Sequence, residues 1–366
     1  MNNPAQIAFI FPTYKRPEEV IFNLSFFREN IALPYEVFIL DNSPKRMKYD
    51  FRENEHYIFF GQNKGTAARN IGIQQTSAPV CLLLDDDSHP LPGTVELLLD
   101  QFQTISKDCA GIICPIDNPD GGQEASLLPT VFHGAGVAFR TATLIQYSLF
   151  YPDFCFYGEE YRLSAEIYKA GFYLSSLPEA RVMHRRSDKE RDLSKIFYYL
   201  GRNNTAIWED IVPEIYRQRV IYDSHRRYEL TSKKEDVFDS YEKGLAEPLG
   251  RSQLTQMGID EFKKFALIND FEKIETSSPL ILAGTGKFPT LWANILAAKG
   301  FRVSLADFNP GLIGQSFGEY NVLSPEDAIT QDSLFILGHS STLDTARWKG
   351  FLTINQKETI DLSDSH

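Results

Sequence analysis

The sequence has few cysteines, no long hydrophobic run and fewer basic than acidic residues. Its cysteines lie in apolar surroundings, without the CxxC or Cys/His spacing of a zinc site. They are Cys81, Cys109, Cys114 and Cys155. We therefore expect buried free thiols rather than a zinc site or a disulfide framework. The longest apolar stretches, such as residues 80–84 and 112–116, are far shorter than the ~20 residues that cross a bilayer, which argues against a membrane span.

The N-terminal segment lacks the features of a secretory signal. Residues 1–6 are polar and lead directly into the apolar segment Ile7–Phe11, without a basic region or a small-residue cleavage site. We expect a cytoplasmic protein, with peripheral contact at the inner face of the membrane as a further option.

Acidic residues outnumber basic ones by 49 to 37, which gives a formal net charge of −12. Nucleic-acid binding requires basic surfaces, so this balance argues against nucleic acid as a partner. Residues 181–234 depart from the average, with 13 Lys and Arg against 8 Asp and Glu. Two interpretations of this basic stretch stay open: a solvated helical face, or a surface that meets a lipid-linked acceptor at a membrane.

The first third of the chain alternates apolar runs with helical patterns. The predicted strands are Ile7–Phe11, Glu36–Leu40, Tyr57–Phe60 and Val80–Leu84, and the predicted helices begin at Arg16 or Pro17 and span Gly65–Gln75. This alternation predicts an α/β fold with a mainly parallel sheet. Ligands of such sheets bind beyond the carboxyl ends of the strands. Polar segments follow all four strands, and we expect them to converge on one cleft: residues 12–16, 41–43, 61–65 and 85–87.

The rest of the chain is predicted to hold a helical region and a separate small module. We expect a strand over Gly134–Arg140, a helix over Glu159–Ala170, a strand over Val182–His184, and mostly helix over Leu193–Phe271. A composition break at residues 276–279 precedes a β-α-β unit of Leu280–Ala283, Pro289–Lys299 and Arg302–Ala306. A length of 366 residues predicts two or three domains. We place them at residues 1–205, 206–275 and 276–366.

Three consecutive aspartates, Asp85, Asp86 and Asp87, follow the predicted strand Val80–Leu84. Mutual repulsion and partial burial disfavour their ionised forms unless a cation neutralises them. Mg²⁺ and Mn²⁺ bind one or two carboxylates together with phosphate oxygens, so such a cluster suits a nucleoside diphosphate. A solvated acidic loop is the alternative for the aspartates taken alone.

Four motifs, in this order, resemble those of the inverting GT-A glycosyltransferases of family 2, over roughly residues 5–205. They are Phe11-Pro12-Thr13-Tyr14-Lys15-Arg16-Pro17, Leu40-Asp41-Asn42-Ser43, Asn63-Lys64-Gly65-Thr66-Ala67-Ala68-Arg69-Asn70-Ile71-Gly72 and Leu84-Asp85-Asp86-Asp87. The last of these stands in the place of the DxD motif of the family. The resemblance implies the GT-A (nucleotide-diphospho-sugar transferase) fold, with a helical extension and the small C-terminal module after it, and an activity of the hexosyltransferase type.

The resemblance also implies roles for single residues at the donor site. Thr13 and Arg16 would flank the base of the nucleotide, and Asp41 would accept a hydrogen bond from the ring N–H. A turn position is the alternative for Asp41 and Asn63, and a surface helix position is the alternative for Arg69. The full set implied in nucleotide-sugar binding is Thr13, Arg16, Asp41, Asn63, Lys64, Arg69, Asp85 and Asp86.

The resemblance further implies a metal site and a catalytic base. The implied ligands of Mn²⁺ or Mg²⁺ are Asp87, as a direct ligand, Asp85 and His184. Glu159-Glu160 resembles the acidic pair, usually Glu-Asp, whose second residue abstracts the proton of the acceptor, and here either Glu160 or Glu159 would do so. The alternative is that two glutamates only favour the start of a helix. Arg185 and Arg186 would neutralise charge that develops on the diphosphate.

The implied function is metal-dependent, inverting transfer of a sugar from a UDP-sugar or dTDP-sugar to a hydroxyl group. The acceptor would be a saccharide or a lipid-linked molecule, in polysaccharide or glycoconjugate synthesis. The alternative is a catalytically inactive nucleotide-sugar-binding or assembly protein on a GT-A scaffold. A nucleotidyltransferase is disfavoured, because residues 12–16 contain no glycine for a phosphate-binding loop.

The C-terminal module resembles half of a Rossmann domain. Gly284-Thr285-Gly286-Lys287-Phe288-Pro289 contains the first two glycines of a dinucleotide fingerprint, and Asp307 follows the second predicted strand. Pro289 stands where the third glycine would permit close packing of the helix, which argues against cofactor binding. We expect this module to act in docking or in oligomer formation.

Overall fold

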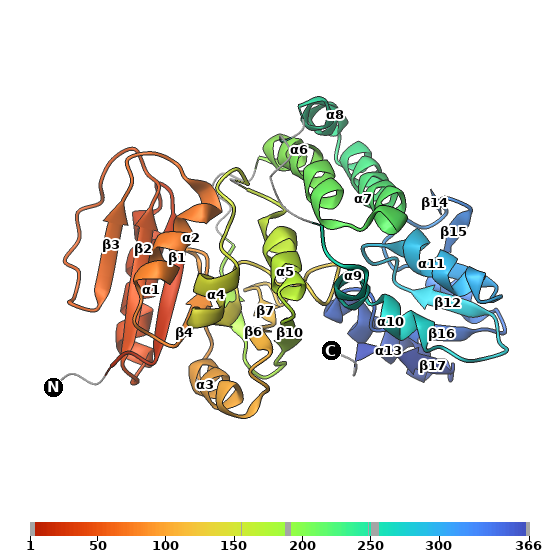
Figure 1. Cartoon of the computed structure of the whole chain (residues 1–366), viewed down its shortest axis with the longest axis horizontal. Helices are drawn as coiled ribbons and strands as arrows, with labels where there is room; N and C mark the ends of the chain where they lie inside the picture. The colour runs from red at the N-terminus through yellow and green to blue at the C-terminus, as the bar shows by residue number, and fades with distance from the viewer. Residues whose placement is uncertain (1–3, 155, 187–191, 248, 250–255, 364–366) are drawn as a thin grey trace. The chain divides into compact units, whose positions relative to one another are not determined.

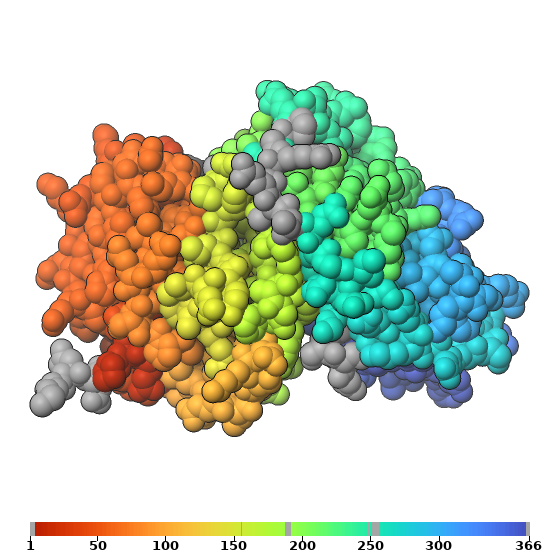
Figure 2. Space-filling model, in the orientation of Figure 1, coloured from red at the N-terminus to blue at the C-terminus, as the bar shows by residue number. Residues whose placement is uncertain are grey.

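A computed structural model describes residues 4–154, 156–186, 192–247, 249 and 256–363. The chain divides into two compact units, the first formed by residues 1–125 and 132–190 and the second by residues 126–131 and 191–366. Apart from residues 126–131, they are the red to yellow-green and the green to blue parts of Figures 1 and 2. The predicted boundaries at residues 205 and 275 stay predictions.

The first unit contains the following elements: β1 (Ile7–Thr13), α1 (Pro17–Asn30), β2 (Tyr35–Asp41), β3 (Glu55–Phe59), η1 (Gly65–Ala68), α2 (Arg69–Gln75), β4 (Val80–Leu83), β5 (Ser88–Pro90), α3 (Thr94–Thr104), β6 (Cys109–Ile113), β7 (Ile116–Asp117), β8 (Gln123–Glu124), β9 (Val137–Arg140), α4 (Thr141–Tyr147), α5 (Glu159–Lys169), β10 (Tyr173–Ser176) and β11 (Val182–His184). A seven-stranded sheet of order β10-β6-β9-β4-β1-β2-β3 forms its centre. Only β9 runs antiparallel to its neighbours among these strands, so the predicted mainly parallel sheet is confirmed.

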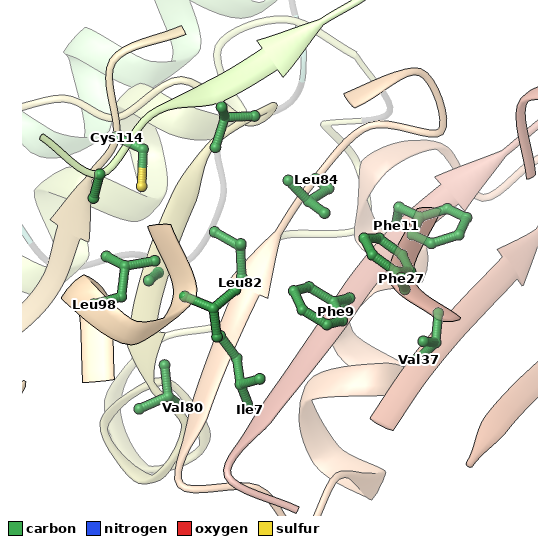
Figure 3. Close-up of a cluster of buried hydrophobic side chains, with 14 of the residues drawn as sticks. Ile7, Phe9, Phe11, Phe27, Val37, Val80, Leu82, Leu84, Leu98 and Cys114 are labelled. Atoms are coloured by element: carbon green, nitrogen blue, oxygen red, sulfur yellow. The ribbon is translucent and has the colours of Figure 1, made fainter. Parts of the chain in front are cut away.

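Both faces of this sheet are covered, which explains why its central strands are almost continuously apolar. On one face, Phe9 stacks on Phe27 of α1 with ring centroids 4.3 Å apart, and Leu98 of α3 joins the same cluster (Figure 3). On the other face, Gly72 of α2 lies so close to Ile10 that a Cβ atom there would approach the isoleucine side chain to 2.9 Å. Because β1, β2, β3 and β4 run parallel, the four polar strand ends lie at one edge of this sheet.

A small second sheet has the order β5-β11-β7-β8, and the chain enters it after the end of β4. Strand β5 begins directly after the aspartates, and His184 of β11 is paired with Ser88 of β5. The backbone N–H of Arg185 also donates to the carbonyl oxygen of Asp87, at 2.8 Å. This pairing brings a histidine from far along the chain to the aspartates.

The second unit contains the following elements: α6 (Leu193–Ile211), α7 (Glu214–Lys234), α8 (Phe238–Ala246), α9 (Ile259–Phe265), α10 (Ile268–Glu272), β12 (Leu280–Ala283), α11 (Pro289–Ala298), β13 (Val303–Ala306), β14 (Ser316–Phe317), β15 (Tyr320–Leu323), α12 (Pro325–Ile329), β16 (Leu334–Leu337), α13 (Thr342–Ile354) and β17 (Thr359–Asp361). The predicted helical region is confirmed by α6 to α10. A six-stranded sheet of order β14-β15-β13-β12-β16-β17 follows, in which only the β14–β15 pair of the described strands is antiparallel.

Three predictions about the elements need correction. The C-terminal sheet is larger than the predicted β-α-β half, because β15, β16 and β17 extend it to both sides of β12 and β13. The strand predicted over Gly134–Arg140 begins only at Val137, since residues 134–136 form a turn. The helix predicted over Gly65–Gln75 starts as a 3₁₀ turn and becomes an α-helix at Arg69.

The cysteines within the described residues follow the prediction of free buried thiols. Cys81, Cys109 and Cys114 are buried and form no disulfide, whereas Cys155 lies outside the described residues. In the part of the chain that the structure describes, no helix is both long and apolar enough to span a membrane.

Candidate active site

The loop after β1 binds the aspartates from one side. The Thr13 hydroxyl donates to Asp86 at 2.7 Å. The guanidinium of Arg16 donates to both Asp86 and Asp87, each at 2.6 Å. Between Thr13 and Arg16, Lys15 has a left-handed backbone with φ of 57°, so the chain turns sharply in this loop. The sequence predicted base contacts for Thr13 and Arg16, and the structure places both against the acidic motif.

The three aspartates differ in burial. Asp86 and Asp87 are each only 4% exposed, whereas 36% of the Asp85 side chain is open to solvent. Asp86 joins the loop after β1 to α1, because its backbone carbonyl accepts from Asn23 at 2.8 Å. The alternative of a solvated acidic loop is therefore wrong for two of the three residues.

Burial and charge act on these carboxyl groups in opposite directions. Burial raises the pKa of Asp86 to about 7, in spite of Arg16. Burial also pushes the pKa of Asp87 upward, but its contacts with His184 and Arg16 outweigh this and hold it well below the usual range. Burial lowers the pKa of His184, yet hydrogen bonds to carboxylates raise it to about 10. Arg16 and, while no cation is bound, a protonated His184 thus supply positive charge to the buried aspartates.

Asp85, Asp87 and His184 each present one ligand atom, and these atoms all lie within 4.8 Å of one another. His184 Nε2 is 3.1 Å from Asp87 Oδ1. The sequence predicted these same three residues as metal ligands. Two carboxylates and one imidazole are a suitable ligand set for a divalent cation such as Mn²⁺. The partial exposure of Asp85 leaves one side of the cluster open to a ligand.

Sequence reasoning missed Glu124 and His133. Glu124 Oε1 lies 3.0 Å from His184 Nδ1, and its other oxygen lies 3.3 Å from His133 Nε2. Burial would raise the pKa of Glu124, but the two histidines hold it well below the usual range. Arg186 donates to the same carboxylate at 2.6 Å. The carboxylate orients the ring of His184, as residues behind metal-binding histidines commonly do.

Arg69 is not on the surface, so that alternative is wrong. It is 2% exposed, and it donates to Asp85 Oδ1 at 2.7 Å and to the carbonyl oxygen of Leu84 at 2.9 Å. It also donates to the carbonyl oxygen of Gly134 at 3.2 Å. Arg69 therefore fixes the strand end that carries the aspartates and balances the charge of Asp85.

Asn63 and Lys64 lie in the loop after β3 and are exposed. Asn63 Oδ1 accepts from the backbone N–H of Gly65 at 2.8 Å, which is the turn role that the sequence left open. The ammonium group of Lys64 lies 5.1 Å from the centre of the Phe60 ring. Their predicted contacts with the nucleotide stay predictions.

A pocket of about 420 Å³ lies between the loops that follow β1 and β2. Its lining residues are Thr13, Lys15, Arg16, Pro17, Asp41, Ser43, Pro44, Lys45, Arg46 and Met47. Asp41 is 2% exposed, accepts from the backbone N–H of Ser43 at 2.8 Å, and also accepts from the Tyr57 hydroxyl. Asp41 thus has a turn role and also lines the pocket.

Glu159 and Glu160 begin helix α5 but have different surroundings. Glu159 is 6% exposed, and burial together with the charge of Glu160 raises its pKa well above the usual range. Its Oε2 atom has no hydrogen-bond partner among the described residues. Glu160 is partly exposed, and its Oε1 lies 3.3 Å from the point where Gly134 would carry a Cβ atom. Arg69 lies 3.7 Å from the same point. Glu160 therefore lies close to the guanidinium that binds Asp85.

Arg185, which the sequence placed near the diphosphate, is bound to other residues. It donates to Glu19 at 2.7 Å and to Asn23 at 3.0 Å, and its guanidinium lies 3.9 Å from the centre of the Phe22 ring. These contacts join β11 to α1. Arg186 remains 36% exposed beside Glu124.

Residues 8–157 match the family model described as Glycosyl transferase family 2. This part of the chain belongs to glycosyl transferase family 2. This part of the chain is therefore a glycosyltransferase domain, and the first unit has the GT-A fold that the four motifs predicted. The match contains the aspartates, Arg69 and Glu124, whereas His184 and Glu160 lie beyond it.

Among solved structures, the chain is similar to GalNAc-T7 with UDP, GalNAc and Mn²⁺, at 13% identity and a TM-score of 0.48, over 76% of this chain and 59% of that chain. It is also similar to the mannosyltransferase PcManGT from Pyrobaculum calidifontis in complex with GDP-Man and Mn²⁺, at 12% identity and a TM-score of 0.45, over 81% and 87%. TarS 1-349 from S. aureus in complex with UDP-GlcNAc has 12% identity and a TM-score of 0.46, over 66% and 80%. No curated protein sequence matches the chain.

Proposed function

We propose that the chain is a metal-dependent, inverting glycosyltransferase that moves a sugar from a UDP-sugar or dTDP-sugar to a hydroxyl group of a saccharide or lipid-linked acceptor. The observation that carries this proposal is the convergence of Asp85, Asp87 and His184 to within 4.8 Å, beside the pocket between the loops after β1 and β2. A role in polysaccharide or glycoconjugate synthesis and peripheral contact with the inner face of the membrane belong to the same proposal.

Asp87, His184 and Asp85 would hold the cation. When bound, Mn²⁺ or Mg²⁺ supplies Lewis-acid stabilisation of the negative charge on the departing nucleoside diphosphate. The ligand set suits this role because the exposed side of Asp85 leaves room for phosphate oxygens. Arg16 already contributes positive charge at the buried aspartates.

The pocket would receive the nucleoside of the donor. Thr13, Arg16 and Asp41 line it, and Lys15, Lys45 and Arg46 add positive charge at its wall. Asn63 and Lys64 lie exposed on the loop after β3, at the same edge of the sheet, where they would reach the donor. Arg69 and Asp86 act in this proposal by holding the strand ends in place, since both are buried and hydrogen bonded.

Glu160 would act as the general base. It accepts the proton of the acceptor hydroxyl while the hydroxyl oxygen forms a bond with the anomeric carbon. The bond from that carbon to the diphosphate oxygen breaks on the opposite face, so the configuration inverts. Glu160 suits this role because it is partly exposed, whereas burial and the neighbouring Glu160 charge raise the pKa of Glu159 and so favour its protonated form.

A screen of nucleotide sugars by thermal unfolding, with and without Mn²⁺, tests the proposal. A true donor stabilises the folded first unit, and its effect should require the cation. Release of the nucleoside diphosphate from that donor, even by slow hydrolysis, would separate an active enzyme from an inactive binding protein. Donor turnover that is undiminished after removal of divalent cations would contradict the proposal.

A further inference from the structure

Helix α7 contacts the part of the C-terminal module where a dinucleotide would bind in a Rossmann fold. The parallel strands of the module have the order β15-β13-β12-β16-β17, so the strand order reverses between β12 and β16. Ligands of open α/β sheets bind beyond the carboxyl ends of the strands at such a reversal. The turn Gly284–Gly286 follows β12 at this place and leads to the N-terminus of α11.

Asp223 of α7 occupies the N-terminus of α11. Its carboxylate accepts from the backbone N–H of Thr290, at 3.2 and 3.1 Å to its two oxygens, and from that of Leu291 at 3.1 Å. Asp223 itself is completely buried. The first N–H groups of a helix attract anions, and in dinucleotide-binding folds this is the place of the pyrophosphate. A carboxyl group of the chain itself therefore lies where the phosphate ligand would lie.

Arg227, one helical turn after Asp223, binds the glycine turn itself. Its guanidinium donates to Thr285 Oγ1 at 2.7 Å and to the carbonyl oxygen of Gly286 at 2.6 Å. Gly286 needs its left-handed φ of +56°, and a Cβ atom there would approach Trp292 to 2.7 Å. The turn is thus held between α7 and α11.

Asp307, the acidic residue of the fingerprint, is also engaged. Its Oδ2 accepts from both the backbone N–H and the hydroxyl of Thr285, at 2.8 and 2.7 Å. In a dinucleotide site the corresponding carboxylate binds the ribose hydroxyls. On the other side, His339 Nε2 lies 2.8 Å from the carbonyl oxygen of Gly284, and His339 is completely buried. Residues of the chain therefore fill the reversal point.

The same face of α7 contacts the β14–β15 hairpin. The Tyr222 hydroxyl accepts from the backbone N–H of Gly318 at 2.7 Å, and Arg226 donates to the carbonyl oxygen of Ser316 at 3.1 Å. With Asp223 and Arg227, these residues form one continuous contact face of the helix. Part of the basic stretch, for which a solvated face was one of the two interpretations, thus points into the protein.

We propose that the C-terminal module is a docking domain for helix α7, in which Asp223 takes the place of a phosphate ligand, and that the module binds no dinucleotide. The partner of the module is thus a helix of the same chain. The module contributes no cofactor to the transfer reaction, and it fixes the helical segment that follows the catalytic unit in sequence.

Tryptophan fluorescence tests this proposal in the full-length chain, because Trp208, Trp292 and Trp348 all belong to the second unit. Thermal unfolding is followed at pH 8 with a chelator present, which keeps metal-dependent nucleotide binding in the first unit out of the measurement. We expect NAD⁺ to leave the unfolding temperature of the wild type unchanged. Asp223→Ala should lower it by roughly 2–8 °C, as the loss of a helix cap does in a unit of this size. The exposed Gln218→Ala in the same helix is the matched control and should behave as the wild type.

Inorganic phosphate distinguishes an anion site from ordinary packing. It should raise the unfolding temperature of Asp223→Ala more than that of the wild type, whereas sodium chloride at equal ionic strength should not. If Asp223→Ala does not fold, Asp223→Asn replaces it. Hydrogen exchange of the Thr290 and Leu291 amides is then measured in the wild type, where we expect slow exchange that NAD⁺ does not alter. An unfolding temperature raised by NAD⁺ in the wild type, or equal stability of Asp223→Ala and Gln218→Ala, would overturn the proposal.

Discussion

Glu124 Oε1 lies 3.0 Å from Nδ1 of His184, whose opposite nitrogen faces Asp87. This arrangement fixes the orientation of the imidazole through a residue that does not itself belong to the metal cluster. Carboxylates behind metal-binding histidines commonly change metal affinity roughly 10- to 100-fold when they are removed. Glu124→Gln should therefore weaken Mn²⁺ binding by about that factor, measured by titration calorimetry. Glu96→Gln, an exposed residue of α3, is the control. Equal Mn²⁺ affinity of both variants would refute a positioning role for Glu124.

Asp87→Ala should abolish sugar transfer and the dependence of nucleotide binding on a cation. Asp87 is the most central of the three candidate ligands, since it contacts both His184 and Arg16. Thermal unfolding with nucleotide and Mn²⁺ measures the binding, and release of nucleoside diphosphate measures the transfer. Asp100→Ala, an exposed aspartate of α3, should leave both unchanged. A metal-dependent stabilisation that persists in Asp87→Ala would argue against this ligand set.

Glu160→Gln should lower kcat by a factor of roughly 10²–10⁴, the usual contribution of a general base. The KM for the donor should stay close to that of the wild type, because Glu160 serves the acceptor. Glu159→Gln should change kcat far less, because burial raises the pKa of Glu159 and favours its protonated form, and glutamine has nearly the same shape. Steady-state kinetics of both variants decides between the two residues. A larger loss in Glu159→Gln would move the base to that position.

Gly134→Ala tests whether the position of the Glu160 carboxylate matters for catalysis. An added Cβ atom would lie 3.3 Å from Glu160 Oε1, close enough to displace the carboxylate by a few tenths of an ångström. We expect a loss of kcat without a loss of stability. Gly350→Ala is the control, because its Cβ atom would meet no atom within 4 Å and alanine favours the helix by about 0.5–1 kcal/mol. Unchanged kcat in Gly134→Ala would place the base elsewhere.

The sequence predicted that the polar residues at the ends of the main strands meet, because parallel strands bring their ends to one edge of the sheet. Asp85, Asp87 and His184 meet in the structure for this reason, together with the register that pairs His184 with Ser88. Glu124 could not be predicted in the same way. Its place depends on how the short strand β8 pairs with β7, and two-residue strands leave no periodic signal in the sequence.

The C-terminal sheet was underestimated for a related reason. Strand β16 is a visible apolar run, Leu334–Leu337, but β15 and β17 are short and partly polar, so propensity alone did not mark them. The face of α7 that carries Asp223 also has the charge pattern of a solvated helix. Its burial depends on the partner that it meets in the fold, and a single sequence does not specify that partner.

Asp223 should also make the stability of the second unit depend on pH. Burial raises its pKa from the ordinary value of 3.8 to about 7, although Arg219 and the bonds from Thr290 and Leu291 oppose this. Between these two values the folded chain keeps a proton that the unfolded chain has lost. The stability from this proton is therefore complete below about pH 4 and is lost as the pH rises through about 7.

We compare the free energy of unfolding of the wild type with that of Asp223→Asn. The wild-type value minus the variant value should fall by an amount on the order of 4 kcal/mol between about pH 4 and pH 7, and it should stay constant above about pH 8. Urea unfolding followed by tryptophan fluorescence measures this difference, and titrations common to both proteins cancel. The same comparison with Asp239→Asn, an exposed aspartate of α8, should be independent of pH. A wild-type minus Asp223→Asn difference that rises with pH would mean that the ionised carboxylate is the favoured form in the fold, because the bonds from α11 then outweigh burial.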